Sequence, residues 1–159
     1  MENRCVIERL QNNDPDLIEL NLYSHNIVRP KIMIPLCEAL KINTILQKLY
    51  ICRNNIDSAG AKAIAEVLKI NTTLRQLDIS NNDISDDGMI AISEALKVNT
   101  TLQLLSVNAN DIGDVGAIAI GEALKINNCL QGLYINDNEI AEAGIIAISR
   151  VCFSLSLIK

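Results

Sequence analysis

The chain is poor in the residues that enzymes and cofactor-binding proteins use most. Its 159 residues include one histidine, no tryptophan and one phenylalanine, and aromatic residues make up 3%. A single histidine cannot form a histidine cluster, and so few aromatics argue against an aromatic-lined cofactor cavity. The sequence also has no glycine-rich phosphate loop, no Ser/His/Asp or Cys/His arrangement and no metal-ligand spacing. We therefore predict a protein that is not an enzyme, with no catalytic residue, cofactor or metal.

Positive charge is also in short supply. Lysine and arginine number 14 against 19 aspartates and glutamates, and the net charge is −5. This balance argues against a nucleic-acid partner. Each of four lysines at expected helix ends has a glutamate three residues earlier, which predicts ion pairs and not a basic binding stripe. These lysines are Lys41, Lys69, Lys97 and Lys125.

An apolar signal core and a long apolar run are both missing. The chain begins Met-Glu-Asn-Arg, and no segment is apolar for long enough to span a membrane. The five cysteines are odd in number and form no Cys-x-x-Cys pair, which is typical of reduced thiols. We therefore predict no membrane partner and a cytoplasmic location, or delivery to a host cytoplasm if the chain is a microbial effector.

What the sequence does contain is a repeated frame, Leu-x-x-Leu-x-(Leu/Ile/Val)-x-x-Asn-x-Ile. The first interval between its starting points is 29 residues and the next three are 28. The frame begins at Leu17, Leu46, Leu74, Leu102 and Leu130. A fixed period of this length is typical of stacked units that cannot bury their apolar faces alone.

Each repeat is predicted to form a short strand, a turn and a helix. In the third repeat Leu77 and Ile79 alternate along the strand, and apolar residues at helical spacing follow from Gly88 to Leu96. An asparagine recurs in the turns, and we expect its amide to satisfy backbone groups there and not to bind a ligand. These residues are Asn54, Asn82, Asn110 and Asn138, with His25 in the same place of the first repeat.

Strands that are joined through helices can pair only in parallel. Because helices are wider than strands, the stack should curve with its sheet on the inside. The sequence therefore predicts an α/β fold, a right-handed horseshoe solenoid of about five repeats with a parallel sheet on the concave side and helices on the convex side. We expect a helical cap at residues 1–16 and repeats at 17–45, 46–73, 74–101, 102–129 and 130–159. In the first repeat, we expect the helix to start at about Pro35.

This frame resembles the leucine-rich repeat family, and within it the ribonuclease-inhibitor-like subclass with helical convex sides. The segment Ile-Ala-Glu-Val-Leu-Lys-Ile-Asn-Thr-Thr-Leu at residues 64–74 is similar to that subclass's usual wording. The resemblance covers nearly the whole chain. It implies a domain whose variable positions recognise another molecule.

The first repeat also resembles the tropomodulin repeat domain. The likeness is carried by Asn-Asn-Asp-Pro-Asp-Leu-Ile-Glu-Leu-Asn-Leu at residues 12–22 and by Glu-Ala-Leu-Lys at residues 38–41. The tropomodulin family caps the pointed ends of actin filaments, so this resemblance implies actin binding as an alternative function. That family's tropomyosin-binding and first actin-binding regions have no counterpart in this sequence.

The concave face, formed by the strand side chains that point away from the core, is the first candidate site. All three tyrosines of the chain fall on it, and tyrosine is a frequent interface anchor. We predict the anchors to be Tyr23, Tyr50 and Tyr134. We predict polar complementarity from Lys48, Arg53, Asp78, Asn108 and Asn136. Cys52 is expected on the same open face.

The turn edge, where the turns lead into the helices, is the second candidate site. It is strongly acidic, which suits a basic partner, but no single turn gathers the several oxygen ligands that calcium requires. Its carboxylates are Asp83, Asp86, Asp87, Asp111, Asp114, Glu139 and Glu142. Asp86, Asp114 and Glu142 come just before helix starts, where capping favours them.

The main prediction is a non-enzymatic interaction module that binds a protein partner of unknown identity through the concave face. One alternative is tropomodulin-like binding to the pointed end of actin filaments. A second is GTPase activation, for which Arg53 and Asn55 form the candidate pair. A third is a structural role with self-association through the C-terminal edge at residues 151–159.

Overall fold

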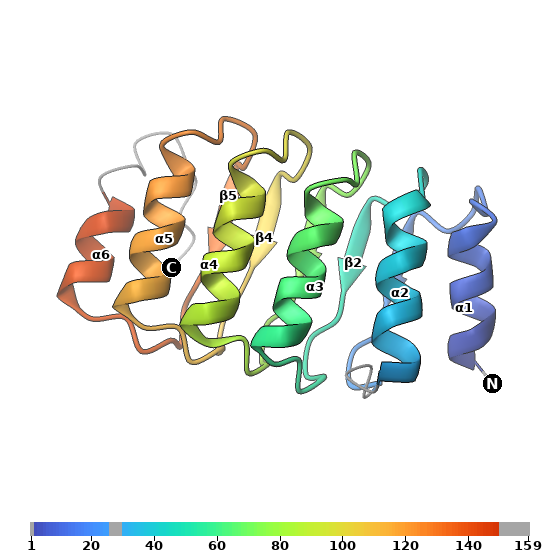
Figure 1. The fold of residues 1–159 in the computed structure, drawn as a ribbon, viewed down its shortest axis with the longest axis horizontal. Helices are drawn as coiled ribbons and strands as arrows, with labels where there is room; N and C mark the ends of the chain where they lie inside the picture. Colours follow the sequence, from blue (N-terminus) through green and yellow to red (C-terminus); the bar gives the residue numbers. More distant parts are fainter. Residues whose placement is uncertain (1, 26–29, 150–159) are drawn as a thin grey trace.

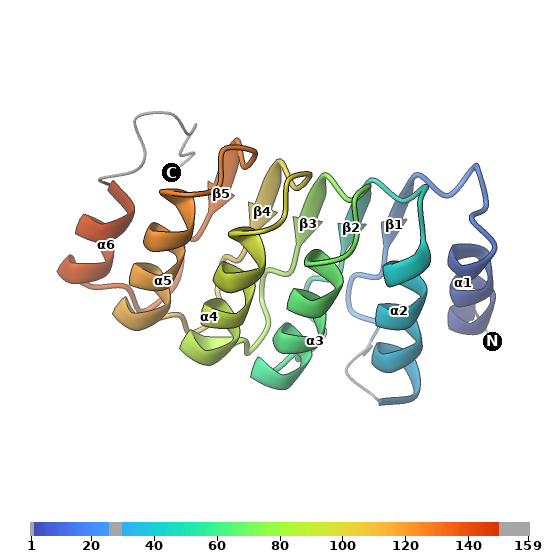
Figure 2. The same ribbon diagram turned by 45° about the horizontal axis from the view of Figure 1, so that its top comes forward.

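Helices and strands alternate along the chain in a single row of repeats. The structure, a computed structural model, describes residues 2–25 and 30–149. The helices line one side of the row and the strands line the other (Figures 1 and 2). The helices are α1 (Glu2–Gln11), α2 (Pro30–Ile42), α3 (Ser58–Leu68), α4 (Ser85–Leu96), α5 (Asp114–Leu124) and α6 (Glu142–Ser149). The strands are β1 (Glu19–Asn21), β2 (Lys48–Tyr50), β3 (Gln76–Asp78), β4 (Leu104–Ser106) and β5 (Gly132–Tyr134).

The five strands form one parallel sheet in the order β1-β2-β3-β4-β5. The frame sets the register, because the second leucine of each repeat lies beside that of the next, from Leu20 and Leu49 to Leu105 and Leu133. All four pairings are parallel, as expected for strands joined through helices. The predicted α/β fold is confirmed.

The core between sheet and helices is built from aliphatic side chains. Leu77 and Ile79 of the third repeat are fully buried, as are Ile92 and Leu96 of α4. Small residues let neighbouring helices approach closely. A Cβ added at Gly121 of α5 would lie 2.9 Å from the carbonyl oxygen of Ala147 in α6. Such contacts leave no room for a methyl group between these two helices.

The asparagine ladder in the turns satisfies backbone groups of the preceding repeat, as predicted. The Oδ1 atom of Asn82 accepts hydrogen bonds from the backbone N–H of Asn54 at 2.9 Å and of Ile56 at 3.0 Å. Its Nδ2 donates to carbonyls of its own and the preceding repeat, among them Ile79 O at 2.8 Å. Asn138 serves the backbone N–H of Asn110 in the same way at 2.9 Å.

A second asparagine ladder runs along the opposite edge, where each helix returns to a strand. Asn71 shows the pattern: its Nδ2 donates to Leu40 O of the preceding repeat at 2.8 Å, and its Oδ1 accepts from the backbone N–H of Leu74 at 2.8 Å. The sequence places these asparagines just after the expected helices, and it does not predict their bonds to the preceding repeat. The members are Asn43, Asn71, Asn99 and Asn127. Because Asn71 and Asn99 are buried and bonded, their Asn-Thr-Thr sequons are part of the frame.

The predicted helix start of the first repeat is wrong. Helix α2 begins at Pro30, and Pro35 lies inside it. Pro30 is the residue at the first helical position, where the missing N–H and fixed φ of proline are compatible with a helix. Pro35 leaves one intrahelical hydrogen bond unmade, because it has no N–H to donate.

The N-terminal helix packs on the first repeat, and ion pairs form at the ends of the repeat helices. Helix α1 lies beside α2 at the end of the row (Figure 1), and Leu10 O accepts from Asn43 Nδ2 at 2.8 Å. All four predicted Glu–Lys pairs form at the helix ends. Over the described part of the chain, no helix has the length and apolarity that crossing a bilayer requires. The predicted self-association edge at residues 151–159 lies outside the described residues.

Candidate functional site

The concave face contains a hollow of about 450 Å³ over the first four strands. Five of the eight predicted site residues line it: Tyr23, Tyr50, Arg53, Asp78 and Asn108. The remaining lining is Asn21, Cys52, Ser80, Asn81 and Ser106. The parallel register brings these side chains together, since residues one repeat apart lie on adjacent strands.

The tyrosines differ in how far they project. Tyr23 is 47% exposed, and the guanidinium of Arg53 lies 5.7 Å from the centre of its ring, a distance suited to a cation–π contact. Tyr50 is half-buried, with its hydroxyl 3.5 Å from Gln76 Oε1. Tyr134 is half-buried on β5 and lies outside the lining of this hollow.

Three predicted residues are not part of the hollow, and two of them make contacts of their own. Lys48 forms an ion pair with Glu19 at 3.1 Å, and the hydrogen bond that its ammonium donates to that carboxylate raises the pKa of Lys48. The backbone N–H of Asn136 donates to Asn108 Oδ1 at 2.8 Å, so this pair connects the fourth and fifth repeats. The concave face therefore has a central hollow and a flank that reaches β5.

Cys52 lines the concave hollow, as expected, but little of its side chain is accessible. It is only 9% exposed, and its Sγ lies 3.8 Å from Asp78 O. Burial, followed by the hydrogen bond with Asp78, raises the pKa of the Cys52 thiol to about 12. Because the thiolate is the reactive form, we expect Cys52 to react only slowly with electrophiles at neutral pH.

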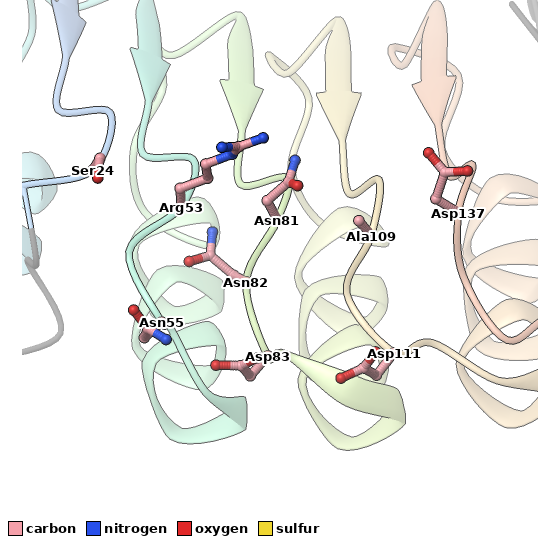
Figure 3. Close-up of a pocket in the computed structure, with 9 residues that line it drawn as sticks. All are labelled: Ser24, Arg53, Asn55, Asn81, Asn82, Asp83, Ala109, Asp111 and Asp137. Atoms are coloured by element: carbon pink, nitrogen blue, oxygen red, sulfur yellow. The ribbon is translucent and has the colours of Figure 1, made fainter.

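A second hollow, of about 460 Å³, lies on the turn edge just beyond the strands (Figure 3). It is lined by Ser24, Arg53, Asn55, Asn81, Asn82, Asp83, Ala109, Asp111 and Asp137. Arg53 and Asn55, the pair named for the GTPase alternative, both line this hollow. GTPase activation itself stays a prediction. Arg53 and Asn81 line both hollows, so the two are continuous.

The aspartates of the turn edge, with Asp57 and Asp137 included, fall into two groups. The first group has structural partners. Asp57 caps its own helix α3 through Gly60 N at 2.9 Å. The expectation that Asp86 and Asp114 cap the helices they begin is wrong, because each accepts hydrogen bonds from the start of the next helix. Asp86 Oδ1 accepts from the backbone N–H of Gly113 and of Gly116, both at 2.8 Å.

Asp114 repeats this arrangement one unit later. Its Oδ1 accepts from the backbone N–H of Ala141 at 2.9 Å and of Gly144 at 2.8 Å, at the start of α6. Asp87 forms an ion pair with Lys62 at 3.4 Å. These carboxylates stabilise the stack and are not free to bind a partner.

The second group has no such role. Within residues 2–25 and 30–149, the side chains of Asp83, Asp111 and Asp137 make no hydrogen bond or ion pair. No group of three or more His, Cys, Asp or Glu among the described residues is arranged to hold a metal ion. Sequence reasoning did not separate these two groups, and it did not single out Asn81, although Asn81 occupies the same frame position as Arg53.

Comparison with known families places most of the chain in a described family. The family model described as "TMOD/LMOD Leucine-rich domain" matches residues 2–110. The match extends well past the first repeat, to which the tropomodulin likeness seen in the sequence was confined.

Individual relatives agree with this match. A 60-residue stretch is 36% identical to leiomodin-2 of Rattus norvegicus, and a 59-residue stretch is 34% identical to leiomodin-1 of Homo sapiens. These stretches cover 38% and 37% of this chain but only 11% and 10% of the relatives, so the chain spans about a tenth of their length.

Solved structures that share the fold include a leiomodin domain and a tropomodulin domain. One is described as "Leiomodin-1 Actin-Binding Site 2 (ABS2)", with 30% identity, a TM-score of 0.81, and coverage of 91% of this chain and 84% of that one. The other is the tropomodulin C-terminal domain of Caenorhabditis elegans, with 18% identity, a TM-score of 0.82, and coverage of 95% and 91%. At that identity the second likeness concerns the fold alone.

Proposed function

The chain belongs to the TMOD/LMOD leucine-rich domain family, and from this premise we propose that it is a non-enzymatic module that binds actin. The observation that carries the proposal is the likeness to the leiomodin-1 domain named for its second actin-binding site. That likeness extends over 91% of this chain at 30% identity. A cytosolic location follows from this proposal, since actin is a cytosolic protein.

We further propose that the concave face makes the contact. Tyr23, Tyr50 and Tyr134 offer ring surface that does not contribute to the aliphatic core, and each buried tyrosine can remove about 150–250 Å² from water. Arg53 and Asp78 beside them supply charges of both signs within one hollow. This mixture of aromatic anchors and surrounding polar groups is typical of protein interfaces.

The test is direct binding of the purified domain to monomeric and filamentous actin. We expect co-sedimentation with filaments or a measurable Kd for the monomer, and slowed elongation if the filament end is the target. If the domain binds neither form and leaves the elongation rate unchanged, the proposal is wrong.

The contribution of the tyrosines can be tested separately. Replacing Tyr50 and Tyr134 together with alanine should weaken actin binding more than tenfold, which corresponds to about 1.4 kcal/mol. The far-ultraviolet circular dichroism should stay unchanged, because neither ring belongs to the core. Val98→Ala, an exposed residue on the opposite edge, is the control. Unchanged affinity of the double variant would place the contact on the turn edge instead.

A further inference from the structure

The turn-edge hollow gathers polar side chains that the fold itself does not use. Over the described residues, Arg53, Asn55, Asn81, Asp83 and Asp111 have no side-chain hydrogen bond or ion pair. They lie together in one hollow of about 460 Å³ (Figure 3). The asparagines of the two ladders, by contrast, bond backbone groups of neighbouring repeats. A cluster without such bonds is therefore available to another molecule.

Arg53 is unusual among the cations of this protein. Of the lysine and arginine side chains that the structure describes, all but Arg53 and Arg75 form ion pairs. Arg53 is exposed and stands beside Asn81, with Asn55 lower in the same hollow (Figure 3). An arginine fork with neighbouring amide donors is well suited to a carboxylate.

The other side of the hollow is negatively charged. Asp83 and Asp111 occupy the same frame position in adjacent repeats, where strands run about 4.8 Å apart. Both are exposed, and no described cation forms an ion pair with either of them. Two neighbouring carboxylates repel each other, and a lysine or arginine side chain placed between them would relieve that repulsion.

We propose that this hollow binds a dipolar segment of the partner protein, with a carboxylate of the segment on Arg53 and a basic side chain between Asp83 and Asp111. The proposal rests on the proposed function, in which the partner is actin. Because Arg53 and Asn81 also line the concave hollow, a segment bound at the turn edge continues onto the tyrosine-bearing face. The two candidate sites are then two parts of one binding surface.

The experiment measures the Kd for monomeric actin at two salt concentrations with charge variants of the hollow. Arg53→Gln, and Asp83→Asn combined with Asp111→Asn, should each weaken binding at least fivefold and reduce its salt dependence. Their melting temperatures should stay close to that of the wild type, because Asp83 and Asp111 have no side-chain hydrogen bond or ion pair in the described fold and Arg53 has only its exposed contact with the Tyr23 ring.

Matched controls make the same charge changes away from the hollow. Arg75→Gln removes the other unpaired described arginine, and Glu66→Gln with Glu94→Gln removes two carboxylates from exposed helix ends. These controls should change the Kd less than twofold. If the hollow variants bind actin as tightly as the wild type, this inference is overturned while actin binding stands.

A second measurement does not depend on actin. The ¹⁵N-labelled domain is titrated with the peptide Ac-Glu-Gly-Gly-Lys-NH₂ and with a neutral analogue that carries glutamine and norleucine. Shifts of the Asn55 and Asn81 side-chain amide signals with the charged peptide alone support the inference, even if the wild type binds no actin. Absence of these shifts, together with absence of actin binding, overturns both the inference and the proposed function.

Discussion

The two asparagines Asn82 and Asn110 occupy equivalent turns but should contribute unequally to stability. Asn82 Oδ1 accepts hydrogen bonds from the backbone N–H of Asn54 and of Ile56. Asn110 Oδ1 is buried and, among the described residues, accepts none. The Nδ2 atoms of both donate to neighbouring carbonyls at comparable distances, including Ile79 O. The two alanine variants therefore differ mainly in one respect: only Asn82→Ala leaves two backbone N–H groups without their acceptor.

The magnitude follows from those two groups. Leaving a buried donor without a partner costs about 1–3 kcal/mol. At the lower end of that range, Asn82→Ala should be less stable than Asn110→Ala by about 2 kcal/mol, because the loss of the amide and of side-chain volume is common to both. For a domain of this size, that difference corresponds to about 4–8 °C in Tm.

Urea unfolding followed by circular dichroism measures the free-energy difference, with the m-value as a check that the same surface unfolds. Amide hydrogen exchange gives a local test, since the N–H groups of Asn54 and Ile56 should exchange faster in Asn82→Ala than in Asn110→Ala. Equal losses of stability in the two variants would refute the reasoning. So would a larger loss in Asn110→Ala.

Three further results are expected. Gly121→Ala should lower the free energy of unfolding in urea by about 1–3 kcal/mol despite alanine's better helix propensity, because its Cβ would meet the Ala147 backbone. Gly132→Ala is the control: its Cβ has ordinary contacts, so stability should change by less than about 1 kcal/mol. A larger loss in Gly132→Ala than in Gly121→Ala would contradict this. Cys52, with its pKa raised to about 12, should be about 10⁻⁴ thiolate at pH 8; its alkylation by iodoacetamide should therefore be slow until urea unfolds the protein, and rapid native labelling would count against its burial. Asp114→Ala removes the oxygen that accepts two N–H groups at the start of α6, so it should cost about 1–2 kcal/mol and speed hydrogen exchange there; unchanged exchange would argue against the cap.

The repeat period made most of the fold predictable. A residue such as Leu77 recurs at a fixed interval, so one assignment extends to every unit, and the parallel register follows from the helical connections. Asn82 was predictable for the same reason, because its amide has to serve turns that recur with it. Pro35 was misjudged because two prolines compete for one helix start, and Pro30 takes the favourable first position.

The candidate site was only partly predictable. Alternation along the strands places Tyr50 and Asp78 on the concave face, but it does not tell how far neighbours cover Cys52. The bonding of Asp86 could not be foreseen, since its partners lie in the next repeat at a helix start defined only by packing. For the same reason, sequence alone could not tell that Asp83 and Asp111 lack structural partners in the described fold.

The polar links between units run in opposite directions along the row. The Asn82 amide accepts hydrogen bonds from the repeat before it, whereas the Asp86 and Asp114 carboxylates accept them from the repeat after. An engineer who transplants one unit into a relative would thus break complementary pairs at both of its borders. Chimeras in this family should exchange blocks of adjacent repeats, so that each of these acceptor side chains stays beside the repeat whose N–H groups it binds.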